Sequence, residues 1–362
     1  MSKIVISGYY GFANAGDEAM LTAIIKSLRS LDPDVDIKVI SGNPEVTAKT
    51  HQVKSIYRFN VLEVLSALAG CDLLVSGGGS LLQDVTSKRS LMYYLSIVAL
   101  GRLLSKKVML FAQGIGPIRN GFMRKLTKQV TSKADLITVR DKDSLYELRR
   151  LGVPESKVLR TADAVFTLPP EDIAYGRRLL DQFHIPTDKM LIALSVRNWQ
   201  EDDSYLLELA KAADGLAQQR KAHIVLLPLQ YPADVEACQR VQQFMDCKAA
   251  STVIKADCDT EGFLSLIGNF DLLIGMRLHA LIFAAVMKVP FVAVSYDPKV
   301  DGFVKDISGV SAGRVNGLQA QQVISAAGQA LLLRWDTCDV LRKLREKSQL
   351  NAEKAMDLIK KN

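Results

Sequence analysis

The sequence predicts an α/β protein in which two doubly wound, Rossmann-like domains face a cleft. Short apolar runs alternate with segments of helical periodicity along nearly all of the 362 residues, which is the pattern of a parallel sheet covered by helices. The alternation breaks between Leu168 and Lys189, where two Pro-containing segments flank one short polar helix. Polar and glycine-rich clusters follow the predicted strands in both halves, at the end of the sheet where α/β proteins bind ligands.

The first half contains six short apolar runs that we interpret as strands. They are Ile4–Ser7, Asp36–Ile40, Leu73–Ser76, Val108–Ala112, Leu136–Val139 and Val158–Thr161. Amphipathic segments between them predict helices, and Gly152 followed by Pro154 ends the last helix in the usual order. The predicted helices are Glu18–Leu31, Val61–Ala69, Leu91–Leu104, Phe122–Ser132 and Lys142–Leu151.

The second half repeats this architecture. Its predicted strands are Leu191–Val196, Ile224–Leu227, Val253–Lys255, Leu272–Ile274 and Phe291–Ser295. Its predicted helices are Ser204–Gln218, Ala233–Phe244, Glu261–Ile267 and Arg277–Val286, with two more from Leu318 onward. We therefore predict an N-terminal domain over residues 1–170, a linker over 171–189, a C-terminal domain over 190–335 and a basic C-terminal helix over 336–362.

Composition narrows the function classes. No apolar run reaches the roughly 18–20 residues that a bilayer-spanning helix needs. The N-terminus has no signal-peptide pattern and the five cysteines form no CxxC pair, so we expect a cytoplasmic protein. The net charge of +7 favours an anionic substrate or membrane surface. Nucleic acid is not expected, because no nucleic-acid motif is present.

Much of the positive charge lies in two segments. One is Arg119–Lys133, and the other is the C-terminal helix from Leu341 to Lys361. The basic residues of that helix are Arg342, Lys343, Arg345, Lys347, Lys354, Lys360 and Lys361. Each segment can be a solvated helix face or a peripheral contact with the inner face of the plasma membrane.

The most informative segment is Asp271–Ala285. An apolar run ends in Gly275, and an almost wholly apolar helix begins at once, with Arg277 and His279 as the polar exceptions. A helix N-terminus at this place offers backbone N–H groups and a partial positive charge. With a cation and an imidazole added, the junction predicts a site for a phosphorylated substrate. The alternative is structural: Arg277 extends to solvent and His279 caps the helix or fills a gap.

Two glycine-rich loops follow strands in the first half. In the first, Asp17 stands at the predicted helix N-cap, and Asn14 and Asp17 can hold sugar hydroxyls; capping alone is the alternative for Asp17. The second, Ser76–Asp84, reads as a strand–glycine–helix junction. Neither has the spacing of a dinucleotide or nucleoside triphosphate motif. The candidate ligand-binding residues of the second loop are Gly77, Gly78, Gly79 and Gln83.

Further polar residues follow other predicted strands. Gln113 and Arg140 do so in the first half, and Arg140 can clamp a carboxylate or phosphate or form a structural pair with an Asp. In the second half Arg197, Gln230 and Lys299 occupy such positions. Together these residues predict one cleft that is rich in cations on its C-terminal side.

No metal or cofactor is expected. Asp141–Asp143 and Asp257–Asp259 resemble the DxD motif of metal-dependent glycosyltransferases, but a three-residue match is weak. No His/Asp/Glu cluster has metal-ligand spacing.

Taken together, these motifs resemble the polysaccharide pyruvyl transferase family, in its bacterial cell-surface-anchoring (CsaB-like) branch. The matching segments are Gly8–Glu18, Ser76–Asp84, Gln113–Pro117, Thr138–Asp141, Gly275–His279 and Ser295–Lys299. The resemblance implies a glycosyltransferase-B-like fold, phosphoenolpyruvate as donor and a pyruvate ketal as product. It also implies an acceptor, N-acetylmannosamine on a polyprenyl-diphosphate-linked cell-wall glycan precursor, whose product anchors surface-layer proteins.

The resemblance places the donor on the C-terminal domain and the acceptor on the N-terminal domain. The expected donor-binding residues are Arg140, Gly275, Arg277 and Lys299. His279 is expected to supply or relay a proton, with Arg277 and Asp17 beside it in the catalytic set. The expected acceptor-binding residues are Asn14, Asp17, Gly77, Gly78, Gly79, Gln83, Gln113 and Arg197.

Two other functions stay open on sequence alone. One is a nucleotide-sugar glycosyltransferase or epimerase of the same fold, which would use His279 and the basic residues on a diphosphate. The other is a non-catalytic glycan-binding protein at the membrane.

Overall fold

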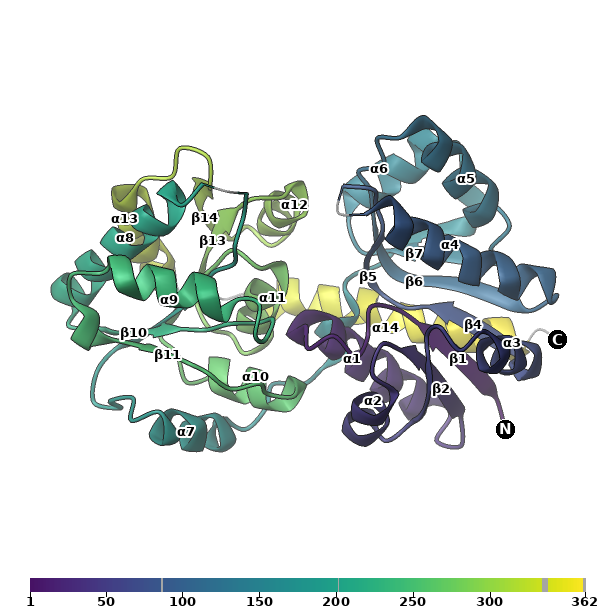
Figure 1. Ribbon diagram of the computed structural model, residues 1–362, viewed down its shortest axis with the longest axis horizontal. Coiled ribbons are helices and arrows are strands. Elements are labelled where there is room, and N and C mark those ends of the chain that lie inside the picture. The colour runs from purple at the N-terminus through teal and green to yellow at the C-terminus, as the bar shows by residue number, and fades with distance from the viewer. Residues whose placement is uncertain (86, 201, 334–337, 361–362) are drawn as a thin grey trace. The chain divides into compact units, whose positions relative to one another are not determined.

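A computed structural model of the chain describes residues 1–85, 87–200, 202–333 and 338–360. Internal contacts divide these residues into two compact units, labelled by element in Figure 1. Unit 1 comprises Met1–Phe12, Asp17–Leu168 and the residues from Arg342 on. Unit 2 comprises the short segment Ala13–Gly16 together with Pro169–Leu341.

Unit 1 is an eight-stranded parallel sheet with helices between its strands. The strands are β1 (Lys3–Ser7), β2 (Asp36–Ser41), β3 (Lys54–Tyr57), β4 (Leu73–Ser76), β5 (Gly79–Leu82), β6 (Lys107–Ile115), β7 (Leu136–Val139) and β8 (Val158–Arg160). The helices are α1 (Ala15–Leu31), α2 (Pro44–His51), α3 (Val61–Gly70), α4 (Lys88–Leu103), α5 (Gly121–Thr131), α6 (Lys142–Leu151) and the C-terminal α14 (Cys338–Lys360). The strand order β3-β2-β1-β4-β6-β7-β8 reverses direction between β1 and β4, and β5 adds to β6.

Both faces of this sheet are buried, as expected for parallel strands. Along β1, Val5 joins one apolar cluster with residues of α3 to α6, while Ile4 and Ile6 point to the opposite face and are equally buried. The carboxyl ends of the strands are therefore the part of the sheet that the helices leave open to ligands.

Unit 2 is a six-stranded parallel sheet. Its strands are β9 (Leu191–Ser195), β10 (His223–Leu226), β11 (Ser251–Val253), β12 (Leu272–Gly275), β13 (Phe291–Ser295) and β14 (Val310–Arg314). Its helices are α7 (Ile173–Gln182), α8 (Ser204–Arg220), α9 (Val235–Phe244), α10 (Thr260–Ile267), α11 (Leu278–Val286), α12 (Pro298–Asp306) and α13 (Ala320–Leu332). The order β11-β10-β9-β12-β13-β14 is that of a doubly wound nucleotide-binding fold, with its reversal between β9 and β12.

The helices of unit 2 form two layers. Helix α8 contacts both α9 and α13 on one face of the sheet, and α10, α11 and α12 form a second connected group with α7 packed on α10 (Figure 1). The predicted α/β class with two Rossmann-like sheets is thus confirmed.

One predicted junction was wrong. Ser76–Asp84 does not pass from strand through glycines into a helix, because Gly79 begins a further strand, β5, and helix α4 starts only at Lys88. Leu81 and Leu82 are buried, and β5 pairs with β6 through Gly79–Gln113 and Leu82–Ile115. Burial of these leucines on the sheet outweighs the helical appearance of the segment.

Several elements were not predicted from the sequence. Strands β3 and β14 and helices α2 and α12 are short and carry mixed polar residues, so their periodicity is weak. The short polar helix that was predicted within the linker is present as α7, and it packs on α10 and belongs to unit 2.

The C-terminal helix α14 is anchored to unit 1 by polar contacts. Its buried Asn351 accepts a hydrogen bond from Thr161 Oγ1 at 2.8 Å and donates to the Ala162 carbonyl at 3.2 Å. Ser348 Oγ donates to the Asp163 carbonyl at 2.8 Å. None of the described helices combines the length and apolar character that a bilayer crossing requires. Lys361 lies outside the described residues.

Candidate functional sites

In unit 2 the segment Ala13–Gly16 pairs with the loop that follows β10. Asn14 forms an antiparallel bridge with Gln230, and the Ala15 N–H donates to the Leu229 carbonyl at 2.9 Å. The Asn14 side chain also accepts a hydrogen bond from the Gly16 N–H at 3.1 Å, at the first turn of α1. Asn14 rather than Asp17 therefore caps this helix, which corrects the predicted N-cap, because α1 begins two residues earlier than Asp17.

This pairing holds Gly16 against the His279 ring. A Cβ atom on Gly16 would overlap the imidazole, so only glycine allows the backbone to approach it this closely. The ring of Phe283, one turn further along α11, has its centroid 6.3 Å from that of His279. His279 is half-buried, in the first turn of a helix that no side chain caps. The structure thus brings the predicted residues Asn14 and His279 to one place.

Arg277 is tightly paired. Its Nε and Nη2 donate to the two carboxylate oxygens of Asp234, each at 2.5 Å, and Nη2 also donates to Gln230 Oε1 at 3.0 Å. The side chains of Arg277 and Asp234 are 11% and 2% exposed. The Nη1 group has no acceptor among the described residues, so it is the part of Arg277 that is available to a ligand. Arg277 therefore joins the ends of β10 and β12, with its charge matched by Asp234.

The other donor residues predicted in unit 2 lie at the carboxyl end of β12 and in the helix that follows β13. Lys299 is in the first turn of α12, with Nζ 3.5 Å from Asp297 Oδ2, while Asp297 Oδ1 accepts the Lys299 backbone N–H at 3.0 Å. Gly275 is the last residue of β12 and is buried, and a Cβ atom there would press on Leu273 and Leu281. Gly275 thus contributes close packing between β12 and α11.

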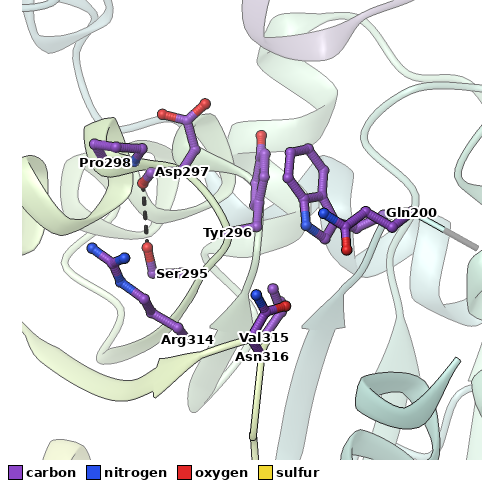
Figure 2. Close-up of a pocket in the computed structure, with 9 residues that line it drawn as sticks. Gln200, Ser295, Tyr296, Asp297, Pro298, Arg314, Val315 and Asn316 are labelled. Carbon is purple, nitrogen blue, oxygen red and sulfur yellow. Dashed lines mark hydrogen bonds between the residues drawn. The ribbon is translucent and has the colours of Figure 1, made fainter. Parts of the chain in front are cut away.

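Beside these residues a pocket opens at the carboxyl ends of β9, β13 and β14 (Figure 2). Its lining residues are Trp199, Gln200, Ser295, Tyr296, Asp297, Pro298, Arg314, Val315 and Asn316. Arg197 supports it, since Nη1 donates to the Tyr296 hydroxyl at 3.0 Å and the guanidinium lies 4.9 Å from the Tyr296 ring centroid. Trp199 and Tyr296 have ring centroids 4.7 Å apart, which gives the pocket an aromatic wall.

In unit 1 the three consecutive glycines are packed by side chains. A Cβ atom on Gly77 would overlap the Tyr10 hydroxyl, and one on Gly78 would overlap the end of Met20. Gly79 has a φ of +109°, and its Cβ position lies 3.0 Å from Asp17 Oδ1. Close packing and the positive φ of Gly79 therefore account for the glycines, while their predicted contact with a saccharide stays a prediction.

Gln113 is fully buried. Its amide group donates to the Ser76 carbonyl at 3.0 Å and to the Gly77 carbonyl, so it holds the turn at the end of β4. This geometry favours a structural role over direct contact with an acceptor. Gln83, directly after β5, is half-buried.

Arg140 is buried among acidic partners. Its Nη1 donates to Asp163 Oδ2 at 2.8 Å, its Nη2 donates to Ser80 Oγ at 3.0 Å, and Nε lies 3.6 Å from Asp141 Oδ2. Burial disfavours the charged guanidinium, but the Asp163 and Asp141 carboxylates outweigh it and raise the pKa of Arg140 above its ordinary value. The structural Arg–Asp pair is present, and donor binding by Arg140 stays a prediction.

Asp17 lies near Arg140 and Gly79, and we call these residues with Gly77 and Gly78 the Asp17 cluster. Burial is the largest cause of the raised pKa of the Tyr10 phenol, and the charge of Asp17 raises it further. The same charge also contributes to the raised pKa of Arg140. The structure therefore brings Asp17, Arg140 and the glycine turn together at the carboxyl ends of unit 1.

Sequence reasoning missed several supporting residues. Asp234 and Asp163 pair with the two arginines, and their signal was only an Asp shortly after a strand. Glu18 and His51 form a third pair, with Nε2 and Oε2 2.9 Å apart, and the other Glu18 oxygen accepts the Gly11 N–H at 2.8 Å. This pair fixes the glycine loop after β1.

The two DxD segments have structural roles. Asp141 caps α6 and Asp259 caps α10, each through a side-chain oxygen that accepts a backbone N–H. Within the described residues, no three His, Cys, Asp or Glu side chains are grouped as a metal site would require. The expected independence from metal stays a prediction.

The fold is shared with enzymes of nucleotide sugars. The UDP-GlcNAc 2-epimerase of Methanocaldococcus jannaschii matches over 100% of both chains, with a TM-score of 0.72 and 12% identity. The S. aureus MnaA structure with UDP matches over 99% of this chain and 96% of its own, with a TM-score of 0.67 and 15% identity. These likenesses place the chain in the class of glycosyltransferase-B-like proteins with two Rossmann-like units.

The family follows from the sequence comparisons. The family model described as polysaccharide pyruvyl transferase matches residues 14–298. The amylovoran biosynthesis protein AmsJ of Erwinia amylovora is 22% identical over 417 aligned positions, covering 94% of this chain and all of that protein. The chain belongs to the polysaccharide pyruvyl transferase family and is a pyruvyltransferase enzyme. The resemblance predicted from its motifs is thus confirmed at family level.

Proposed function

We propose that the enzyme transfers pyruvate from phosphoenolpyruvate to N-acetylmannosamine on a polyprenyl-diphosphate-linked cell-wall glycan precursor. The family supports pyruvate transfer to a saccharide. The motifs that resemble the cell-surface-anchoring branch support the acceptor and a role in surface-layer anchoring. The observation that carries the proposal is the grouping of His279, Gly16 and Arg277 at the uncapped start of α11.

The proposed reaction needs three kinds of group. The donor methylene carbon gains a proton and becomes a methyl group, which leaves an electron-poor carbon that a sugar hydroxyl attacks. The bond to phosphate then breaks, and a second hydroxyl closes the ketal. One hydroxyl proton balances the proton given to carbon, and the other leaves with phosphate. The site must therefore bind two anionic groups, donate a proton and accept one.

The residues of unit 2 suit the donor. The N-terminus of α11 and the Nη1 group of Arg277 can hold an oxygen of the phosphate, as helix termini and guanidinium groups commonly do. Lys299 can hold a second anionic group, since its pair with Asp297 is long. His279, the titratable group at this helix start, can donate the proton to carbon. In unit 1, Asp17 and the glycines Gly77, Gly78 and Gly79 would serve the acceptor.

Phosphate release tests the function directly. The purified protein is incubated with phosphoenolpyruvate and a panel of N-acetylhexosamine acceptors, including a short-chain polyprenyl-diphosphate-linked N-acetylmannosamine disaccharide. We expect inorganic phosphate to appear only when donor and a suitable acceptor are both present. A parallel incubation with UDP-sugars tests the alternative, which would yield UDP or an epimerised sugar.

Donor binding is expected to be electrostatic and independent of metal. Activity should be unchanged in excess EDTA, while rising salt should weaken donor binding, because it screens the attraction between cationic groups and phosphoenolpyruvate. The measurements are initial rates with and without EDTA and the donor KM at several salt concentrations. Activity that is lost on chelation and restored by magnesium or manganese would contradict this.

We further propose that the Arg119–Lys133 segment brings the enzyme to the membrane that holds a lipid-linked acceptor. It contains five basic and no acidic residues. On α5, Lys125 and Lys128 are exposed beside Phe122, which is 65% exposed. Arg124 of this segment pairs with Glu147 of α6, whereas on α14 the acidic partners lie on the helix itself, with Arg342 paired to Glu346 and Lys354 to Asp357.

Vesicle sedimentation tests this membrane contact. Each basic residue near an anionic surface contributes about 1 kcal/mol, so replacing Lys125, Lys128 and Lys133 by Gln should weaken binding to phosphatidylglycerol vesicles by roughly 100-fold. The matched control replaces Lys343, Lys347 and Lys360 on α14, and it should cost much less. Equal binding of the native enzyme to anionic and neutral vesicles would rule out the contact.

A further inference from the structure

Unit 1 carries a group of aromatic rings around one arginine, at the carboxyl ends of its strands. We name Tyr9, Phe12, Arg58, Phe59 and Tyr93 the aromatic–arginine platform. The Arg58 guanidinium lies 4.4 Å from the ring centroid of Phe59, 5.0 Å from that of Tyr93 and 5.2 Å from that of Phe12. Tyr9 stacks on Phe12 with centroids 4.3 Å apart. Phe59 is 59% exposed, so the platform faces solvent.

The backbone holds this platform in place. The Gly42 N–H donates to the Tyr10 carbonyl at 2.9 Å, and the Arg58 N–H donates to the Ser41 carbonyl at 2.9 Å. A Cβ atom on Gly42 would overlap the Phe12 ring, so glycine is required where that ring packs. Loops that follow β1, β2 and β3 are thereby tied together before any ligand binds.

The charge of Arg58 is not matched by the protein. No carboxylate among the described residues forms an ion pair with it, in contrast to Arg140 and Arg277. Its Nε atom is buried and has no hydrogen-bond partner within the described part of the chain. The aromatic faces stabilise a cation but offer no acceptor for its N–H groups. A half-buried guanidinium with unused donors is suited to a planar anionic group.

We propose that the aromatic–arginine platform is a subsite for an acidic saccharide. Sugar rings pack their C–H faces on Phe12, Phe59 and Tyr93, and a carboxylate or phosphate of the same saccharide binds Arg58. The proposal rests on the proposed function, in that the saccharide is the acceptor or its lipid-linked diphosphate end. It lies on the carboxyl side of β1, as the Asp17 cluster does, within the same unit.

Calorimetric titration without phosphoenolpyruvate tests the subsite independently of catalysis. The probes are hyaluronan tetrasaccharide, which carries carboxylates, chitotetraose, which is neutral, and N-acetylglucosamine 1-phosphate. Arg58→Ala is expected to weaken binding of the acidic probes by about 10- to 100-fold and to leave chitotetraose unchanged, whereas Phe59→Ala weakens all three. The two acidic probes show whether the subsite takes a sugar carboxylate or a phosphate.

Matched variants separate this role from others. Arg149→Ala removes an exposed guanidinium that pairs with Glu155, and it should leave all three affinities unchanged. Phosphate release measured on the same samples reports the proposed function separately, since binding can persist when transfer fails. Equal affinities for native and Arg58→Ala protein would overturn the proposal. The proposal would also be overturned if Arg58→Ala and Phe59→Ala lost binding to vesicles but kept their affinity for all three saccharides. The platform and the exposed residues Val61 and Leu62 would then form a lipid contact.

Discussion

Asp234→Ala is expected to lower the free energy of unfolding of unit 2 by about 3–5 kcal/mol, because it leaves a buried guanidinium without its counter-charge. The Arg277 side chain, which is only 11% exposed in the native protein, loses both of its 2.5 Å hydrogen bonds. Asp234 also accepts the Gln230 N–H at 3.0 Å, so the loop after β10 loses an anchor as well. Urea unfolding followed by tryptophan fluorescence measures the effect, since Trp199 packs against the apolar core of unit 2.

Two controls test whether the loss of stability comes from the unpaired buried charge of Arg277. Asp301→Ala removes the partner of Arg314, which is 70% exposed, and should cost at most about 1 kcal/mol. Joint replacement of Arg277 by Met and Asp234 by Leu should recover much of the stability, because an apolar pair of similar volume needs no counter-charge. If Asp234→Ala lowers the free energy of unfolding no more than Asp301→Ala does, the Arg277–Asp234 pair between β10 and β12 contributes little to stability.

The fold was largely readable from the sequence because parallel strands leave a strong pattern. Buried runs such as Leu73–Ser76 and Phe291–Ser295 are apolar on both faces, so their short uninterrupted hydrophobic stretches stand out. The strand β5 could not be predicted, since glycines separate it from β4, Gly79 has a positive φ, and Leu81 and Leu82 fit a helix equally well. Pairing with β6 decides between the two, and pairing is a tertiary contact.

The candidate sites were readable only in part, for a related reason. A polar residue that follows a strand is predicted to lie at the carboxyl end of the sheet, and His279, Arg277 and Asn14 are all found there. Their partners are distant in sequence, because Asp234 is 43 residues from Arg277 and Asp163 is 23 from Arg140. The sequence shows the cations but not the carboxylates that pair with them. It therefore overestimated the unpaired positive charge at these sites.

His279→Ala is expected to lower kcat by about 10²–10⁴-fold, the usual contribution of general acid–base catalysis, while the donor KM changes little. Arg277, Lys299 and the start of α11 would still hold the phosphate. Steady-state kinetics with varied phosphoenolpyruvate separates this from a binding role, in which KM rises and kcat is largely kept. Near-native kinetics with lower thermal stability would instead mean that His279 only fills space beside Gly16 and Phe283.

Gly16→Ala tests whether the position of the His279 ring matters, because it moves the ring without removing it. The added Cβ atom would overlap His279, so the ring must shift or the Asn14–Gln230 bridge must open. If His279 donates a proton along a defined direction, kcat should fall for Gly16→Ala, though less than for His279→Ala, and the double variant should be no slower than His279→Ala alone. Additive losses in the double variant would show that Gly16 acts on the reaction through another group, since two changes to one proton donor cannot count twice.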